Sequence, residues 1–323
     1  MTTLSFPQAP VADWLKAGRE RSSRRSYDGT PVDATAIAAI EQFAHTFHPS
    51  EVARTVLLRQ ASPRMFTGIL GSYGKVSGAP SALVFIGTVG APGVDECVGY
   101  TGEAAVLEAT RLGMDSCWLG GTLNAARVTD AVKLKSGERV FGISPLGYAT
   151  SRTNFAERTI FGHTSPGPKP RKFAEEIAPG FDSLPPWARA GIEAARLAPS
   201  ALNRQPWRFS YAQGRIAIAH EGSDAYKKVS KRLDCGIAML HFEIGARHAG
   251  VSGHWELLST GSDVASFVLD RKDMSCASTI FSTSHTRASE LSPSGPPRVG
   301  TRSAAHPCTP RSSCIQASSR CSW

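Results

Sequence analysis

The sequence lacks the signatures of several common protein classes. Its 323 residues contain no uninterrupted apolar stretch near the ~20 residues of a membrane span, so no membrane partner is expected. Residues 1–25 have no apolar core of the secretory type, which predicts a cytoplasmic protein. No Gly-x-Gly-x-x-Gly turn and no Gly-x-Ser-x-Gly elbow occurs. A Rossmann NAD domain and a serine hydrolase are therefore disfavoured.

Charge and metal-ligand patterns exclude further classes. Lys+Arg number 36 against 27 Asp+Glu, a formal net charge of +9, and much of this excess lies towards the two ends. No basic stripe with interleaved aromatics accompanies it, so we expect an anionic small ligand and no nucleic acid. The 7 cysteines include no pair at two-residue spacing and the 9 histidines are scattered, which predicts no metal site.

A polar loop at residues 198–207 carries the strongest functional signal. It follows an apolar-periodic run at 187–197 and precedes a strand-like run at 209–219, with Pro199 as the helix stop. Carboxamides both donate and accept, which suits the mixed hydrogen-bonding edge of a heterocycle. An ordinary helix-to-strand loop is the alternative. The candidate binding side chains are those of Ser200, Asn203 and Gln205.

A basic loop near the N-terminus is the second candidate site. Residues 21–27 contain three arginines and three serines, and they precede a helix predicted at 34–43 with Asp33 as its N-cap. Guanidinium groups match phosphate oxygens in a bidentate way that lysine does not. Taken alone, the loop is either an anion site or a solvated basic turn. The residues that would bind are Arg21, Ser23 and Arg25.

The organisation of the chain repeats after a proline-rich boundary at residues 165–170. The first part predicts strands at 55–59, 81–89 and 140–148 and a helix at 99–112 that ends at Gly113, before the turn Trp118-Leu119-Gly120-Gly121. The second part predicts a matching helix at 236–249 that ends at Gly250, followed by Trp255. We infer two degenerate copies of one α+β unit, at residues 10–164 and 184–270, joined by a linker at 165–183.

Both loops resemble segments of the FMN-dependent nitroreductase family, and in particular its single-chain tandem branch. The resemblance covers approximately residues 10–270 and implies an α+β, nitroreductase-like fold with an intramolecular pseudo-dimer. The first copy retains the arginine loop, but after Pro49-Ser50 it has no Asn, Gln or Trp. The second copy retains those residues and has Glu175-Glu176 in place of arginines. One complete site, built from both copies of a single monomer, is therefore expected.

The resemblance implies FMN as cofactor and NAD(P)H as co-substrate. Because the chemistry is that of the flavin, no protein residue is assigned a catalytic role. A nitroaromatic, quinone or related acceptor would then receive the electrons in ping-pong hydride transfer. A non-catalytic FMN-binding, storage or sensing protein, and a dehydrogenase or dehalogenase of the same superfamily, are the alternatives. The implied contacts are to the phosphate from Arg21, Ser23 and Arg158, to the ribityl chain and ring from Arg25, and to the ring or ribityl hydroxyls from Gly120, Gly121, Ser200, Asn203 and Gln205.

The last stretch, residues 271–323, differs from the rest. Ser, Pro, Arg, Thr and Cys dominate it and hydrophobic periodicity vanishes. This composition predicts a disordered basic tail or an aberrant, frameshifted terminus. In both cases no packed domain is expected there.

Overall fold

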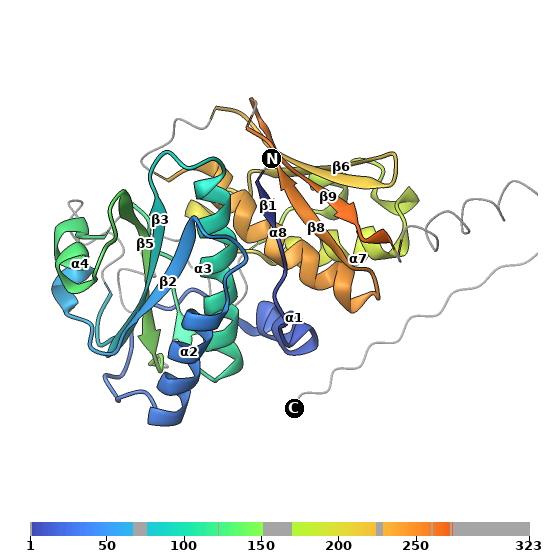
Figure 1. Cartoon of the computed structure of the whole chain (residues 1–323). Helices are drawn as coiled ribbons and strands as arrows, with labels where there is room; N and C mark the ends of the chain where they lie inside the picture. The colour runs from blue at the N-terminus through green and yellow to red at the C-terminus, as the bar shows by residue number, and fades with distance from the viewer. Residues whose placement is uncertain are drawn as a thin grey trace, which may run out of the picture. The chain divides into compact units, whose positions relative to one another are not determined.

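The fold is described from a computed structural model of the chain (Figure 1). The structure describes residues 2–66, 76–121, 123–150, 170–223, 229–259, 261–271 and 273. The chain divides into one unit of Met1–Thr279 and another of Ile280–Trp323, and every described residue belongs to the first. Arg158 and most of the predicted tail therefore lie outside the described residues.

A four-stranded antiparallel sheet forms in the first part of the chain. Its central strand, β3, is buried along almost its whole length, as its continuous apolar run predicts. The strands lie in the order β2-β3-β5-β4, and their bounds are β2 (Ala53–Leu58), β3 (Ser81–Thr88), β4 (Asp115–Ser116) and β5 (Glu138–Gly147). The helices of this part are α1 (Val11–Glu20), α2 (Ala34–Thr46), α3 (Val94–Arg111) and α4 (Ala125–Ala131), with the 3-10 turn η1 (Pro63–Met65).

A five-stranded antiparallel sheet forms in the second part, in the order β1-β8-β9-β7-β6. Its edge strand β1 comes from the N-terminus, where Thr3 pairs with Glu256. The strands are β1 (Thr3–Leu4), β6 (Trp207–Ala212), β7 (Arg215–His220), β8 (Gly253–Leu257) and β9 (Asp263–Leu269). The helical segments are α6 (Ala174–Ile177), η2 (Phe181–Ser183), α7 (Pro186–Ala195), η3 (Ala201–Asn203) and α8 (Lys231–His248).

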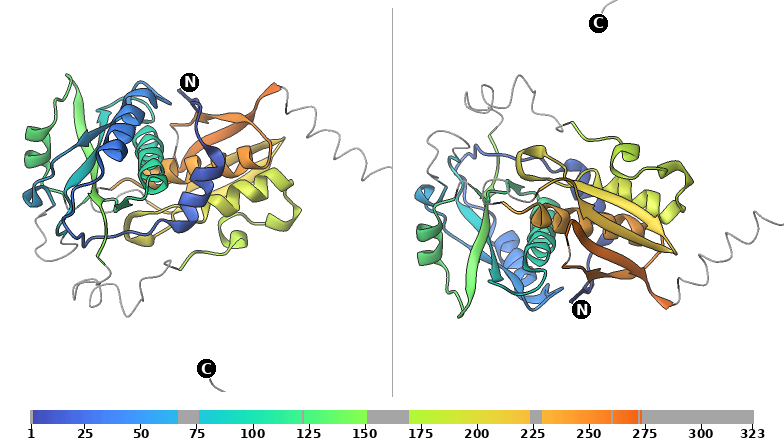
Figure 2. Two further views of the ribbon diagram at one scale, coloured as in Figure 1. Left: turned by 90° about the horizontal axis from the view of Figure 1, so that it is seen from below. Right: turned by 90° about the horizontal axis from the view of Figure 1, so that it is seen from above.

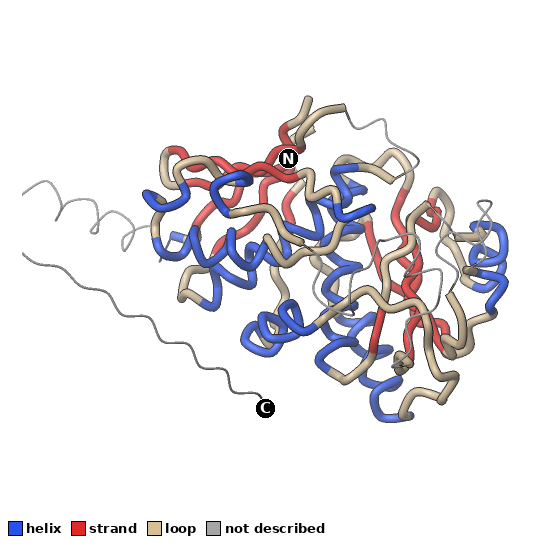
Figure 3. Tube along the Cα trace, turned by 180° about the vertical axis from the view of Figure 1, so that it is seen from behind, coloured by secondary structure: helices blue, strands red, loops and turns tan. Residues whose placement is uncertain are grey.

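The two sheets share one connectivity. Leaving out β1, each sheet has four strands whose order in space is first, second, fourth, third in the chain. In both parts a helix precedes the first strand and an 18-residue helix joins the second strand to the third. The sheets are shown as two separate red groups in Figure 3.

The two long helices, α3 and α8, lie side by side between the sheets (Figure 1 and Figure 2). They approach closely because glycine occupies the crossing on both sides. A Cβ on Gly99 would lie 2.1 Å from the Leu233 carbonyl oxygen, and one on Gly236 would lie 2.2 Å from that of Glu96. No other residue type fits at these two positions without moving a helix backbone.

The main hydrophobic core extends across both parts. It joins Trp14 and Leu83 to Trp207, Phe242 and Trp255 in one cluster of buried side chains. Burying large aromatic side chains is among the strongest contributions to stability, and aromatic pairs prefer edge-to-face contacts. Phe242 meets Trp255 in such a contact, with ring centroids 5.4 Å apart. The shared core makes the two halves one folded body.

The structure corrects the predictions for one strand and for the starts of two helices. The single strand expected at 209–219 is a hairpin, because Gln213 and Gly214 both have positive φ (51° and 77°) and turn the chain between β6 and β7. Two consecutive positive φ values are typical of the tightest hairpin turns. The helices expected at 99–112 and 236–249 each begin five residues earlier, at Val94 and at Lys231, and the Ser230 side chain caps the second. The described part of the expected linker, 170–183, contains α6 and η2.

Candidate anion-binding site

The basic loop is held in an extended conformation between structural elements. Helix α1 ends where the Arg21 N–H donates to the Ala17 carbonyl at 2.8 Å, after which the backbone becomes extended. Ser23 then forms a β-bridge with Ser116, next to the hydrogen bond from Arg24 N–H to the Ser116 carbonyl at 2.9 Å. These contacts fix the backbone from which the Arg21 side chain projects.

The Arg21 side chain points into the protein and is only 6% exposed. Its Nε lies 3.8 Å from Glu103 Oε1, on a side chain that is fully buried. Its Nη1 is also buried and has no hydrogen-bond partner among the described residues. Buried donors of this kind are rare in native proteins because an unmade hydrogen bond costs about 1–3 kcal/mol. The atom is therefore a ready donor for a ligand.

Glu103 lies where the two parts of the chain meet. The Trp118 indole Nε1 donates to its Oε2 at 2.7 Å. His241 Nε2, from α8, lies 2.9 Å from its Oε1. A carboxylate only accepts hydrogen bonds, so His241 carries its proton on Nε2 in this contact. Both oxygens of the buried carboxylate therefore have donors before Arg21 is considered.

A second arginine, Arg171, approaches the same place from the second part of the chain. It donates from Nη1 to the Ala198 carbonyl (2.9 Å) and to Asn203 Oδ1 (3.0 Å), and from Nη2 to the Leu197 carbonyl (2.9 Å). Burial, and next the positive charge of Arg21, lower the pKa of Arg171 from its usual value to about 10, while Glu103 acts in the opposite sense. Arg171 is still cationic at neutral pH, so two cations share this region with one carboxylate.

The sequence patterns did not predict Arg171 as a site residue. The residue lies within the stretch predicted to be a linker, where no periodicity indicates its neighbours. The only signal in the sequence is a short basic run, Lys169-Pro170-Arg171-Lys172, between the proline-rich boundary and α6. Its role depends on contacts to residues that lie about 27 to 32 positions away.

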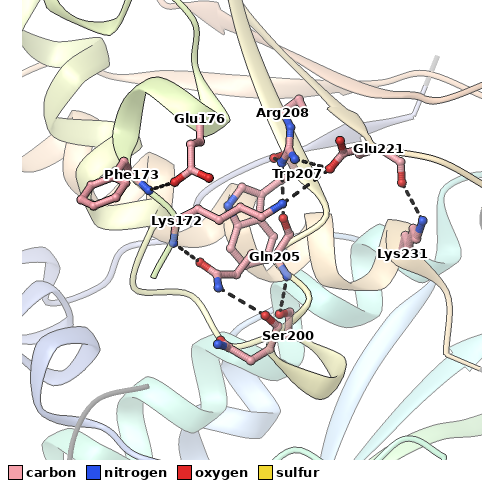
Figure 4. Close-up of polar contacts among 10 residues, drawn as sticks. Lys172, Phe173, Glu176, Ser200, Gln205, Trp207, Arg208, Glu221 and Lys231 are labelled. Atoms are coloured by element: carbon pink, nitrogen blue, oxygen red, sulfur yellow. Dashed lines mark hydrogen bonds and ion pairs between the residues drawn. The ribbon is translucent and has the colours of Figure 1, made fainter. Parts of the chain in front are cut away.

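The predicted polar loop holds residues 170–172 in place, and Figure 4 shows Gln205 bonded to Lys172 and to Ser200. Gln205 Oε1 accepts from the Lys172 N–H at 2.9 Å, and the Gln205 N–H donates to Ser200 Oγ at 2.9 Å. The two hydrogens of Gln205 Nε2 go to the carbonyls of Pro170 (3.3 Å) and Asn203 (3.2 Å). Asn203 Nδ2 donates to the Pro170 carbonyl at 2.9 Å. Gln205 and Asn203 thus bond directly to residues 170–172, and Ser200 holds the backbone of Gln205.

The same loop has a strained backbone. Leu202, Asn203 and Gln205 have φ values of 53°, 56° and 46°, a region that non-glycine residues rarely adopt. Such residues cost about 1 kcal/mol or more each and persist when surrounding contacts determine them. Asp234, in the first turn of α8, supplies two of those contacts: its Oδ1 accepts from the Ala201 N–H (3.0 Å) and its Oδ2 from Arg204 Nε (2.6 Å).

The remaining predicted residues make contacts of their own. A Cβ on Gly120 would lie 3.1 Å from Val229 Cγ2, so this turn lies against the start of the α8 segment, and Gly121 is exposed. The Arg25 carbonyl accepts from the Ser77 N–H at 3.0 Å. The hydrogen bond from Arg171 to Asn203, and the electrostatic influence of Arg21 on Arg171, place Arg21, Arg171 and Asn203 in one region. Two further predicted residues, Ser23 and Arg25, follow Arg21 in the basic loop. The other two, Gly120 and Gly121, follow Trp118, which donates to Glu103.

The site suits an anion with several acceptor oxygens. Two guanidinium groups against one carboxylate leave a net positive charge in a largely buried position. Charge-assisted hydrogen bonds from arginine to phosphate are short and strong, and a phosphate oxygen would satisfy the uncommitted Arg21 Nη1. No cluster of three or more His, Cys, Asp or Glu side chains that could hold a metal occurs among the described residues.

Comparison with known proteins identifies the family. Residues 13–246, well over half of the chain, match the family model described as "Putative TM nitroreductase". The chain therefore belongs to this nitroreductase family. Within the described part of the chain, no helix is both long and apolar enough to cross a bilayer. A search of curated proteins gave no match.

One solved structure shows the same fold, and two further solved structures are similar over about half of the chain. A structure from Thermotoga maritima MSB8, described as a "putative nitroreductase", is 21% identical with a TM-score of 0.53, covering 81% of this chain and 96% of its own. An FMN-dependent nitroreductase from Clostridium difficile R20291 is 17% identical with a TM-score of 0.36, covering 48% and 99%. A nitroreductase with bound FMN from Bacteroides fragilis NCTC 9343 is 20% identical with a TM-score of 0.35, covering 47% and 95%.

Proposed function

We propose that this protein is an FMN-dependent oxidoreductase that uses NAD(P)H to reduce nitroaromatic, quinone or related acceptors by ping-pong hydride transfer. The observation that carries the proposal is a pair of arginines, Arg21 and Arg171, that influence each other electrostatically. The buried Nη1 of Arg21 has no hydrogen-bond partner among the described residues and can donate to a phosphate. Family membership supports a flavin oxidoreductase, and similar solved structures named as FMN-dependent or FMN-bound support the cofactor.

The chain's own residues would bind and orient the cofactor. We propose that Arg21 and Arg171 bind the phosphate of FMN, and that Ser23 and Arg158 bind it as well. When bound, FMN supplies the hydride chemistry, so no side chain needs to act as acid or base. The residues proposed to contact the ribityl chain or the ring are Arg25, Gly120, Gly121, Ser200 and Asn203.

Asn203 and Gln205 differ in what they have left to offer a ligand. Both amide hydrogens of Gln205 are committed and its side chain is buried, so its proposed part is to hold the loop. Asn203 Nδ2 gives one of its two hydrogens to Pro170 in the contacts among the described residues. Of the two amides, Asn203 is therefore the one proposed to donate to the flavin.

We propose further that the two parts of the chain are tandem copies that act as a pseudo-dimer within a monomer. Helices α3 and α8 begin at residues 94 and 231 and end at 111 and 248, a constant offset of 137 positions. Gly99 faces the backbone of residue 233, and Gly236 faces that of residue 96. Gly236 is the counterpart of Gly99 at this offset, and residue 233 is the counterpart of residue 96, so the two contacts are reciprocal. A contact in which each partner presents the same surface is the mark of a two-fold interface.

The buried polar cluster is present once, which supports one site per chain. At the same offset, Glu103 corresponds to Leu240 in α8, and His241 corresponds to Ala104 in α3. The second copy therefore has an apolar residue where the first has the carboxylate next to Arg21. A stoichiometry of one FMN per monomer is expected.

The test uses purified full-length protein loaded with FMN under anaerobic conditions. Addition of NADH or NADPH should bleach the visible flavin absorbance, and a nitroaromatic or quinone should then restore it. Arg21→Ala should bind FMN more weakly, which ties the result to this site. Protein that binds FMN without bleaching would support the alternative, a non-catalytic storage or sensing protein. Protein that binds no FMN would contradict the proposal. We also propose a cytoplasmic location, which this test does not address.

A further inference from the structure

We propose that Glu103 is a positioning residue that orients Arg21 towards the phosphate of the cofactor. The inference rests on the proposed function, because it takes the ligand of Arg21 to be a phosphate. It assigns a purpose to a buried carboxylate that takes no part in hydride transfer and touches no reacting atom.

The position of the Glu103 carboxylate is determined before it meets Arg21. A buried carboxylate is costly unless hydrogen bonds and opposite charges compensate it. Trp118 donates to one oxygen and His241 to the other, at 2.7 Å and 2.9 Å. The Trp118 ring is in turn stacked on Phe85, with ring centroids 4.0 Å apart. The carboxylate therefore cannot rotate to follow Arg21, and Arg21 must orient to it.

The contact to Glu103 engages the Nε side of the Arg21 guanidinium. Glu103 Oε1 lies 3.8 Å from Nε, whereas Nη1 has no partner among the described residues. The five N–H donors of a guanidinium lie in a rigid planar fork, so fixing one edge fixes the directions of the others. Glu103 thus leaves the outer donors of Arg21 directed at a ligand.

Glu103 also allows two arginines to occupy one buried region. The positive charge of Arg21 lowers the pKa of Arg171, and the negative charge of Glu103 raises it. Replacing the carboxylate with a neutral amide would remove that compensation and let the two guanidinium groups move apart. A phosphate that needs both groups would then bind more weakly.

Glu108 provides a matched control on the same helix. It accepts from the Trp14 indole Nε1 at 2.8 Å and from Arg111 Nε at 2.9 Å, so it resembles Glu103 in its type of partners. Its arginine partner is on the surface with a side chain 33% exposed, and none of these residues belongs to the proposed site. Glu108→Gln therefore reproduces the loss of a buried carboxylate without affecting Arg21.

The experiment compares dissociation constants for FMN and riboflavin, which differ in the phosphate, by quenching of flavin fluorescence. In Glu103→Gln we expect about a tenfold loss of FMN affinity, as for one weakened charge-assisted hydrogen bond, with riboflavin affinity unchanged. Glu108→Gln should keep the wild-type preference for FMN over riboflavin. A loss of fold would lower both affinities together, so the ratio separates positioning from stability.

An unchanged ratio in Glu103→Gln would overturn the inference and leave the proposed function standing. Wild-type protein that binds neither flavin would contradict both. If Glu103→Gln does not fold, Trp118→Phe decides the matter, because it keeps the stacking on Phe85 and removes one donor to the carboxylate. A lower FMN preference in Trp118→Phe supports the inference, and a wild-type preference overturns it.

Discussion

Arg171 donates a hydrogen bond of 3.0 Å to the Asn203 side chain, and by doing so it connects two segments that the sequence presents as unrelated. One segment had the composition of a linker, and the other is the polar loop of the family. The electrostatic influence of Arg21 on Arg171 extends this connection to the first part of the chain. The proposed cofactor site is therefore built around an arginine that belongs to neither predicted loop.

Replacing Arg171 tests this arrangement directly. Arg171→Ala should weaken FMN binding by tenfold or more, because one charge-assisted phosphate contact is worth about 1.5–3 kcal/mol. Arg171→Lys should recover part of the affinity but not the hold on the Leu197 and Ala198 carbonyls, so its melting temperature should stay below that of the wild type. Flavin titration and thermal unfolding measure the two effects. Arg215→Ala, at an exposed pair with Glu256, is the control and should change neither.

The pH dependence of stability should carry a contribution from Glu243. Burial raises its pKa from 4.5 to about 7, although Arg247 and Tyr100 act against the shift and Asp270 acts with it. A raised folded-state pKa adds stability at low pH that is lost as pH rises through the window from about 4.5 to about 7. Urea unfolding at pH 5 and pH 8 should show this fall in the wild type and a smaller fall in Glu243→Gln.

Glu108 provides the control for this experiment, because its pKa is shifted in the opposite direction to that of Glu243. Burial raises the pKa of Glu108, but the hydrogen bonds from Arg111 and Trp14 outweigh it and leave the pKa below 4.5. The stability from this group is present above the unfolded-state pKa and is lost in acid. Glu108→Gln should therefore leave the difference between pH 5 and pH 8 almost unchanged. If both variants remove the same slope, the assignment to Glu243 is wrong.

The helix crossing predicts a large packing effect at two glycines. Gly99→Ala and Gly236→Ala each place a methyl group within about 2 Å of a carbonyl oxygen of the facing helix, so each should cost about 3 kcal/mol or more. A Cβ at Gly113 or Gly250 would meet no atom within 4 Å. Gly113→Ala and Gly250→Ala should therefore cost only the strain of placing alanine at a positive φ, about 1 kcal/mol. Chemical unfolding of the four variants checks the order. Equal costs across the two pairs would contradict the close approach of α3 and α8.

The β6–β7 hairpin predicts a stabilising substitution. Gln213 has a φ of 51° at the first turn position, where asparagine is far better tolerated and Asn-Gly is the preferred pair. Gln213→Asn should therefore raise the free energy of unfolding by a few tenths to about 1 kcal/mol. The same change at Gln42, inside α2, should instead lower it slightly because asparagine is a weaker helix former. A destabilised Gln213→Asn variant would contradict the turn assignment.

Much of the fold followed from local signals in the sequence. Periodicity and the terminal glycines Gly113 and Gly250 located the long helices, and a continuous apolar run located β3 within a residue. Both candidate loops were predicted because their residue types and spacing carry chemistry locally. The nitroreductase family, which the resemblance predicted, is confirmed by the match over residues 13–246.

Only the tertiary structure decided which polar groups meet. Arg171 gains its partners from residues 26 to 32 positions away, and Glu103 meets His241 across 138 positions. No periodicity or motif encodes such pairs. The Glu103–His241 contact in particular joins α3 to α8, which pack closely at Gly99 and Gly236. The sequence by itself determined the two candidate loops and the family. Tertiary packing brought a buried carboxylate to within 3.8 Å of Arg21 and an arginine from the supposed linker into its electrostatic range, and so decided the charge of the site.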